Sequence, residues 1–411
     1  MHLRRRKRKL VLLMALLLVA AIAADGQQLT TGFALRDQDR VVFFGDSITQ
    51  QRLYTTYIEH YVLTRFPDRR VTFINSGWDG DQVTSNDCKP CAGTGAMARL
   101  KRDVIDRQPT VVTLLFGMND GRYQEFDPAI LKVYEDGMDR IIRQLKTNTH
   151  APRIYAMTPT VYDPTRHTPW SKTDRYNEVL DSYSEAAKQL AAREGLSIID
   201  LHRVTTEALR RAKEIEPSYT FVEDGVHPDE NGHMIMAAEI LRAWGAPLMG
   251  TVIDKQATSG AQGSGKWSLS VAAPLPWPMP PPSEQIRRAR PEIMQIGNVV
   301  LKISGLPDGK YKVTVDGSNA GWYTAESLRV GLPISLLSAQ AMRESRALYD
   351  LVQLRAFLYF TRWRQVEIPI SGPSRGNPSL ASLDALIDEI TERARTLGKL
   401  HEYRLVVTRT S

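Results

Sequence analysis

Short apolar runs alternate with helical patterns between about Asp39 and Gly250, and this alternation constrains the fold more than any other feature of the sequence. Runs that are short and apolar throughout are typical of parallel strands buried on both faces. The runs are Val41–Phe44, Val71–Ile74, Val111–Phe116, Arg153–Met157 and Leu196–Ile199. Since helical patterns separate them, the sequence predicts an α/β domain with a parallel five-stranded sheet that helices cover on both faces.

The helical patterns between these runs place their apolar residues on one face at the spacing of an α-helix. They cover Tyr54–Val62, Ile130–Leu145, Asp174–Arg193 and His233–Trp244. In an open parallel sheet of this kind, ligands bind at the carboxyl ends of the strands. We therefore expect the functional residues to follow the strands directly.

The pattern changes after residue 250, and we expect a second structural region there. Residues 251–296 contain a glycine-rich stretch and the proline-rich stretch Leu275–Pro282, which predicts an extended linker. Residues 297–411 predict a mixed β and helical region. Its expected elements are strands at Val299–Ser304, Tyr311–Val315 and Tyr403–Val407, and helices at Leu336–Trp363 and Leu380–Leu397.

Residues 1–24 have the layout of a secretory signal peptide. The basic segment Arg4–Lys9 precedes the apolar run Leu10–Ala24, which is shorter than a membrane-spanning helix requires. We expect cleavage after Ala23 or Ala24 in preference to an uncleaved anchor, and hence an exported protein without stable membrane association. Because six of the 53 basic residues lie in this segment, against 46 acidic residues in the chain, the mature protein is near neutral and gives no case for nucleic-acid binding.

The sequence contains two cysteines, Cys88 and Cys91, in the order Cys-Lys-Pro-Cys. In an exported chain this spacing within a polar loop favours a small structural disulfide over a redox dithiol. Two thiols alone are too few ligands for zinc, and no second pair matches them, so we predict no metal site.

Four short polar blocks follow predicted strands or precede the last helix of the α/β domain. They are Gly45-Asp46-Ser47, Asn75-Ser76-Gly77-Trp78-Asp79-Gly80, Gly117-Met118-Asn119-Asp120 and Asp224-Gly225-Val226-His227-Pro228. A serine hydroxyl is a poor nucleophile without a general base, and His227 has a side chain suited to that role. Asp224, three residues earlier, is placed to orient the imidazole. A glycine N–H and an Asn side chain are neutral donors suited to a developing oxyanion.

These four blocks resemble blocks I, II, III and V of the SGNH/GDSL hydrolase family, in the family's order, and the resemblance covers about residues 40–248. It implies a three-layer αβα, flavodoxin-like domain, here placed at residues 36–250. It implies that Ser47 is the nucleophile, His227 the general base and Asp224 the residue that orients it. The oxyanion donors it implies are the backbone N–H groups of Ser47 and Gly80 and the side chain of Asn119. No cofactor is required.

The expected activity is ester hydrolysis through an acyl-serine intermediate. Export and the lack of a broad apolar lid segment favour a polar substrate, and we expect removal of acetyl groups from a polysaccharide or a small acylated molecule. The alternatives are a short-chain lipase-like or thioesterase-like carboxylesterase, and a carbohydrate-binding protein in which the hydrolase fold is a scaffold. For Trp277, Trp322 and Trp363, core packing is favoured over a carbohydrate platform. The sequence leaves the oligomeric state open.

Overall fold

The computed structural model describes residues 32–84, 95–149, 152–166, 168–169, 171–247, 250–257, 265–370 and 378–410. The expected signal peptide and the two cysteines lie outside these residues. Within the described ranges, the helices lack the combination of length and apolar character that crossing a membrane requires.

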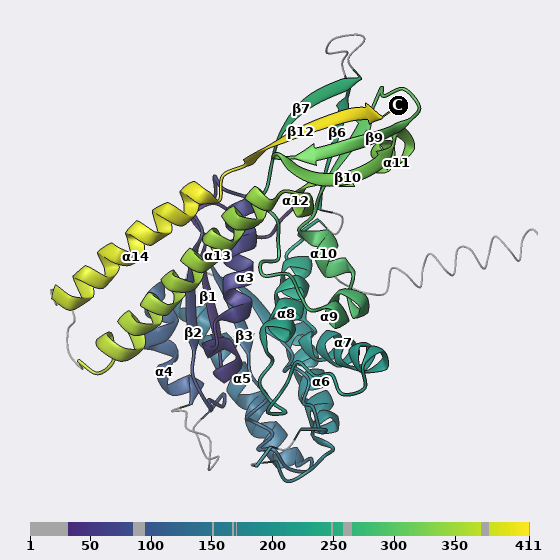
Figure 1. The fold of residues 1–411 in the computed structure, drawn as a ribbon. Coiled ribbons are helices and arrows are strands. Elements are labelled where there is room, and N and C mark those ends of the chain that lie inside the picture. The colour runs from purple at the N-terminus through teal and green to yellow at the C-terminus, as the bar shows by residue number, and fades with distance from the viewer. Residues whose placement is uncertain are drawn as a thin grey trace, which may run out of the picture.

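A parallel five-stranded sheet forms the centre of the N-terminal domain, in the order β2-β1-β3-β4-β5 (Figure 1). Its strands are β1 (Arg40–Gly45), β2 (Thr72–Gly77), β3 (Val111–Leu115), β4 (Arg153–Met157) and β5 (Ser197–Ile199). Each lies on one of the apolar runs, so the predicted α/β fold class is confirmed. Gly45 lies beside Gly77 and Leu115 in register. The three polar blocks that follow these parallel strands therefore lie together at the carboxyl end of the sheet.

Helices cover the sheet, and their apolar faces form a continuous core with it. They are α2 (Ser47–Gln50), α3 (Leu53–Arg65), α4 (Ala96–Asp103), η1 (Ile105–Arg107), α5 (Pro128–Asn148), α6 (Tyr176–Glu194), α7 (Leu201–Ile215) and α8 (Glu230–Ala243). Helix α8 packs between α3 and α7, while α5 packs against α4 and α6. Four of them, α2, α4, η1 and α7, lie where the sequence analysis placed no element.

The C-terminal region adds two small sheets, ordered β10-β9-β12-β7 and β11-β8-β6. Their strands are β6 (Thr251–Gln256), β7 (Lys266–Ala273), β8 (Val299–Ser304), β9 (Lys310–Val315), β10 (Ser318–Thr324), β11 (Leu332–Pro333) and β12 (His401–Thr410). The sheets share a second core to which β7, β8, β9 and β12 all contribute. The β unit projects from one end of the molecule (Figure 1).

Residues 251–296, expected to be an extended linker, are more ordered than that expectation. They contain β6, β7 and the short helices α9 (Glu284–Ala289) and α10 (Glu292–Ile296). Apolar residues of α9 and α10 belong to the core of the N-terminal domain. The proline-rich stretch Leu275–Pro282 connects β7 to α9, while most of the glycine-rich stretch lies outside the described residues.

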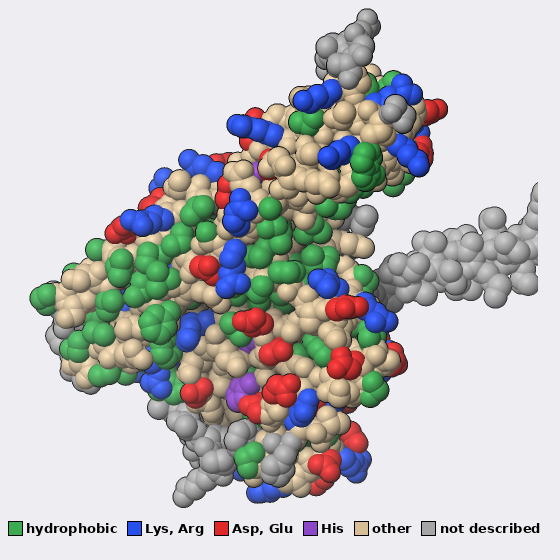
Figure 2. Space-filling model, in the orientation of Figure 1, with side chains coloured by type: hydrophobic (Ala, Val, Ile, Leu, Met, Phe, Trp, Pro, Cys, Tyr) green, Lys and Arg blue, Asp and Glu red, His purple; other side chains and the backbone are tan. Residues whose placement is uncertain are grey.

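The remaining helices are α11 (Ala325–Val330), α12 (Ile334–Leu337), α13 (Ala339–Phe360), the π-helical segment η2 (Thr361–Glu367) and α14 (Pro378–Leu397). Helices α13 and α14 form a hairpin, and α13 packs on α3 (Figure 1). Hydrophobic side chains gather on the outer face of this hairpin (Figure 2), where Leu354, Phe357 and Leu386 are exposed.

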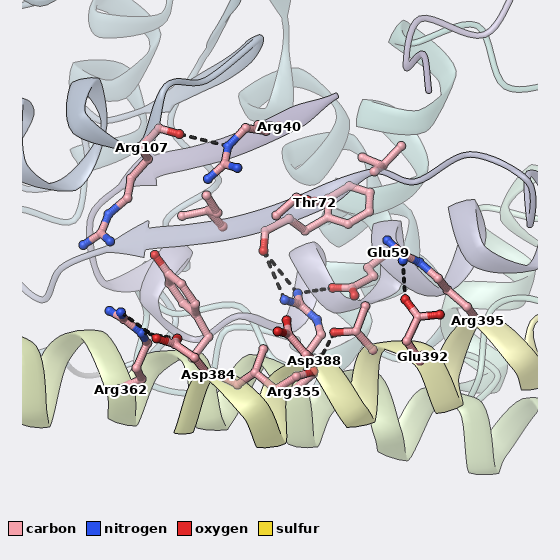
Figure 3. A pocket seen from close by; sticks show the side chains of 16 residues that line it. Arg40, Glu59, Thr72, Arg107, Arg355, Arg362, Asp384, Asp388, Glu392 and Arg395 are labelled. Atoms are coloured by element: carbon pink, nitrogen blue, oxygen red, sulfur yellow. Dashed lines mark hydrogen bonds and ion pairs between the residues drawn. The ribbon is translucent and has the colours of Figure 1, made fainter. Parts of the chain in front are cut away.

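The hairpin also covers the edge strand β2, whose outer backbone groups have no neighbouring strand. Arg355 of α13 donates to the carbonyl of Phe73 at 3.2 Å and pairs with the buried Glu59 of α3. A polar cavity of about 560 Å³ remains between β2 and α14, lined by arginines and carboxylates from both sides (Figure 3). An arginine thus satisfies part of an open sheet edge that a further strand would otherwise occupy.

Candidate active site

Ser47 is the first residue of α2 and directly follows the end of β1. The side chain of Asp46 caps this helix by accepting a hydrogen bond from the Ile48 N–H at 3.0 Å. The Ser47 N–H is one of the first amides of the helix, which have no partner within the helix itself. The turn therefore presents the hydroxyl and the backbone N–H of one residue together, with Ser47 only 9% exposed.

His227 and Asp224 meet Ser47 from the far end of the domain. His227 Nε2 lies 2.8 Å from Ser47 Oγ, and His227 Nδ1 lies 2.6 Å from Asp224 Oδ2. The other oxygen of Asp224 accepts from the Val226 and His227 N–H groups at 2.9 and 2.7 Å. These bonds tie the loop to the carboxylate that contacts the imidazole. The structure thus joins the three residues predicted as a triad in one hydrogen-bonded chain.

The electrostatics of this chain suit proton transfer. Burial lowers the pKa of His227, but the hydrogen bond and the negative charge of Asp224 outweigh it, and the net shift is upward from 6.5. Burial opposes ionisation of Asp224, yet its hydrogen bonds to His227 and to the loop amides lower its pKa to about 2. At neutral pH the aspartate is charged, so it holds the Nδ1 proton and leaves Nε2 facing the serine.

The loop after β2 carries Gly80 beside the serine turn. Asn75 donates to the Thr49 carbonyl at 2.7 Å and accepts from the Gly77 N–H at 3.0 Å, which ties this loop to α2. A β-carbon at Gly77 would overlap the backbone of Thr49 and Gln50. Gly80 has a φ of 66°, in the left-handed region that favours glycine.

Asn119 is buried in the loop after β3. Its side-chain nitrogen donates to the Asp81 carbonyl at 3.1 Å, and its side-chain oxygen accepts from the Tyr123 hydroxyl at 2.8 Å. These contacts fix which end of the amide is the donor, and the amide has a second N–H. The neighbouring Asp120 accepts from the Gly117 and Val83 N–H groups, each at 2.9 Å, and so joins this loop to the one after β2.

Sequence reasoning missed Arg99, which lies at the centre of these loops. Its guanidinium donates to the carbonyls of Gly45 and Ser76 at 3.0 and 2.7 Å and to the Asp81 carboxylate at 2.5 Å. It is 2% exposed. Nothing in its local sequence marks it as part of the site, because the three residues to which it donates these bonds lie 18 to 54 residues away.

Two further residues near the site are buried by contacts with distant elements. His233 is completely buried and contacts the Tyr54 N–H and the Gln51 side chain. Trp78 is buried against Trp363 and Arg364 of η2.

Trp277, Trp322 and Trp363 do not form a common platform. Trp277 and Trp363 are each 1% exposed, and their indole N–H groups donate to the Tyr57 carbonyl and to Asp103, at 2.8 and 2.9 Å. Trp322 on β10 is 62% exposed. Within the described ranges, no group of three or more His, Cys, Asp or Glu side chains is arranged to hold a metal ion.

Comparison with known proteins relates this chain to acyl hydrolases. Residues 43–235 match the model of the GDSL-like lipase/acylhydrolase family. An acetylxylan esterase of Geobacillus stearothermophilus is 27% identical over 227 residues, which cover 50% of this chain and 94% of the esterase. That likeness is therefore confined to about half of the chain.

A second comparison covers nearly the whole chain. The solved structure of a gut microbial diltiazem-metabolizing enzyme has a TM-score of 0.74, with 21% sequence identity, and covers 94% of this chain and 100% of that protein. At this identity the likeness concerns the fold alone. It shows that the C-terminal region, as well as the α/β domain, has a structural counterpart in another protein.

Proposed function

This chain belongs, through residues 43–235, to the SGNH/GDSL hydrolase family, and on that premise we propose that it is a carboxylic ester hydrolase with Ser47 as nucleophile. The observation that carries the proposal is the hydrogen-bonded chain from Ser47 through His227 to Asp224, with distances of 2.8 and 2.6 Å. Both distances are within hydrogen-bonding range, as proton transfer from a serine nucleophile to a histidine base requires.

The proposed reaction has two steps. Ser47 Oγ attacks the ester carbonyl while His227 Nε2 takes the hydroxyl proton, and the imidazolium then protonates the leaving alcohol. The N–H groups of Ser47 and Gly80 and the free N–H of the Asn119 side chain stabilise the tetrahedral oxyanion. Water, deprotonated by His227, then hydrolyses the acyl-serine and regenerates the enzyme.

The proposed substrate is an acetylated carbohydrate. Its support is the likeness to an acetylxylan esterase over the half of the chain that holds the triad. Acetyl is a small acyl group, so we expect rates on p-nitrophenyl esters to fall as the acyl chain grows, and acetylated xylan or pectin to release acetate. A rate that rises with chain length would instead favour a lipase-like carboxylesterase.

Labelling by a fluorophosphonate tests the proposed activity itself. The wild-type protein is expected to bind the probe covalently and to hydrolyse p-nitrophenyl acetate, and Ser47→Ala is expected to lose both. The loss in kcat should be on the order of 10⁴-fold or more, since the variant has no nucleophile. Absence of labelling in the wild-type protein would favour the alternative in which the fold is a carbohydrate-binding scaffold.

A further inference from the structure

The π-helical segment η2 of the C-terminal region contacts the loops that carry the oxyanion donors. Trp363 is 1% exposed and packs edge-on against Trp78, with the ring centroids 6.0 Å apart. The guanidinium carbon of Arg364 also lies over the Trp78 ring, 3.0 Å from the ring centroid. Trp78 is two residues from Gly80, and the backbone N–H of Trp78 donates to the Gly45 carbonyl at 3.0 Å. Trp363 and Arg364 therefore both pack against Trp78, the residue that follows β2, precedes Gly80 by two positions and hydrogen-bonds to the end of β1.

A buried polar chain makes a second connection from η2 to the site. The Trp363 indole N–H donates to Asp103 at 2.9 Å, and Asp103 lies 3.5 Å from a guanidinium nitrogen of Arg99. Arg99 donates to the Asp81 carboxylate at 2.5 Å, and the carbonyl of the same Asp81 accepts from the Asn119 side chain at 3.1 Å. Asp103, Arg99 and Asp81 are at most 2% exposed.

Arg99 makes this chain sensitive to small displacements. It binds the carbonyl of Gly45, two residues before Ser47, the carbonyl of Ser76 at the end of β2, and the carboxylate of Asp81, whose carbonyl accepts from Asn119. A shift of Arg99 consequently moves all three predicted oxyanion donors relative to one another. In a preorganised site, a misplacement of about 1 Å costs on the order of 10²-fold in rate.

The segment η2 is itself held rigidly on the N-terminal domain. Glu367 accepts from Arg107 at 3.1 Å and pairs with Arg362. Arg362 also binds Asp384 of α14 at 2.5 Å (Figure 3). Ion pairs thus hold η2 near both of its ends, while Trp363 and Arg364 between them contact Trp78. These contacts of η2 with Trp78 are separate from the contact by which Arg355 of the hairpin covers the edge strand β2.

We propose that Trp363 and Arg364 are positioning residues of the oxyanion hole, so that the C-terminal region acts on the chemical step from outside the catalytic domain. The inference rests on the proposed ester hydrolysis. Weakening these contacts should lower kcat more than it changes KM, because a displaced oxyanion hole loses stabilisation of the transition state and not of the ground state.

The decisive comparison is between Trp363→Phe and Trp277→Phe. Both tryptophans are 1% exposed, both lie in the C-terminal region and both donate an indole N–H to a buried acceptor, but Trp277 bonds the Tyr57 carbonyl of α3 instead of the Asp103 chain. We expect Trp363→Phe to lower kcat about tenfold with KM changed less than about twofold. Trp277→Phe should lower the melting temperature without this loss in kcat.

Hydrogen exchange measured by mass spectrometry gives a readout that does not require activity. Trp363→Phe should accelerate exchange in residues 77–84, and Trp277→Phe should not. Equal kcat and equal exchange in the two variants would overturn the inference. A wild-type protein that hydrolyses no ester would refute the proposed function, while the exchange comparison would still decide whether η2 holds the loop.

Arg364 provides a variant with little risk to folding, because it is partly exposed. Arg364→Ala removes the cation over Trp78 and should lower kcat several-fold, and Arg364→Lys should restore part of it by keeping a positive charge over the ring. If both variants retain the wild-type kcat and the wild-type exchange in residues 77–84, Arg364 has no positioning role.

Discussion

His227 and His233 are six residues apart, yet their environments assign them different chemistry. His227 is half-buried beside Asp224, and its net pKa shift is upward. His233 is completely buried, and desolvation together with the nearby His227 lowers its pKa to about 3. His233 is therefore neutral throughout the working range of pH. Of these two histidines, only His227 can lose catalytic competence by protonation near neutral pH.

The pH dependence of the reaction follows from this assignment. His227 must be neutral to accept the serine proton, so kcat/KM should fall as the pH drops below a pKa that lies above 6.5. Asp224→Asn removes the hydrogen bond and the charge that raise this pKa, so the acidic limb should move to lower pH. The variant should also lose about 10⁴-fold in kcat, because Asn does not hold the required tautomer.

Asp79→Asn is the matched control for the charge alone. Asp79 is exposed and contributes a smaller upward shift to the pKa of His227. Its replacement should move the acidic limb in the same direction by less and leave most of kcat intact. An acidic limb that stays in place in Asp224→Asn would mean that another group controls the profile. The measurement is kcat/KM between about pH 5 and 9.

At the residue scale, the sequence indicated the triad residues because each follows or precedes a recognisable element. Ser47 lies at the end of an apolar run, and His227 and Asp224 lie just before a helical pattern. Arg99 and Trp363 had no such signal. Both residues contact partners that are far away along the chain. From the sequence alone, an arginine in a polar helix such as α4 is expected to be exposed to solvent.

At the scale of elements, buried parallel strands were the most predictable feature. The apolar runs at residues 111–116 and 153–157 match β3 and β4 to within one residue, because such strands are apolar throughout. Strands β6 and β10 were missed, since none of their residues is fully buried and neither has an apolar run like those of the central sheet. Helix α7 was also missed, although Leu201, Val204, Ala208 and Ala212 recur on one buried face at helical spacing.

The contact between α3 and α13 provides a test at this scale. Glu59 and Arg355 form an ion pair whose side chains are 7% and 9% exposed. Glu59→Ala would leave the guanidinium buried without its counter-charge, and should lower the free energy of unfolding by about 3 kcal/mol. The double replacement Glu59→Leu with Arg355→Met should recover most of this loss, because apolar packing replaces both charges. Chemical denaturation measures both quantities.

A surface pair on the same helix is the control for Glu59→Ala. Arg346 and Asp350 lie four residues apart on α13, 2.9 Å from each other, with side chains 52% and 53% exposed. Water screens such a pair, so Asp350→Ala should change the free energy of unfolding by less than about 0.5 kcal/mol. If Glu59→Ala costs no more than Asp350→Ala, the buried pair does not secure the hairpin.

At the scale of the whole molecule, the two cores are joined through single elements. Helix α13 places Tyr349 in the core of the α/β domain, and Leu348 and Val352 in the core of the β unit. Helix α3 belongs to the α/β domain, yet its Leu63 packs in the second core. Residues of α9 and α10 return to the first core. A boundary near residue 250 is visible in the sequence pattern but does not separate the packing.

Such shared packing should make unfolding cooperative across the chain. We expect calorimetry of the full protein to show one transition, with a ratio of van't Hoff to calorimetric enthalpy of about one. Leu63→Ala should lower the stability of the whole molecule by about 2 to 3 kcal/mol and shift the single transition downward. Two resolved transitions, with Leu63→Ala moving only one of them, would show instead that the β unit unfolds independently and that α3 and α13 do not transmit its loss to the active site.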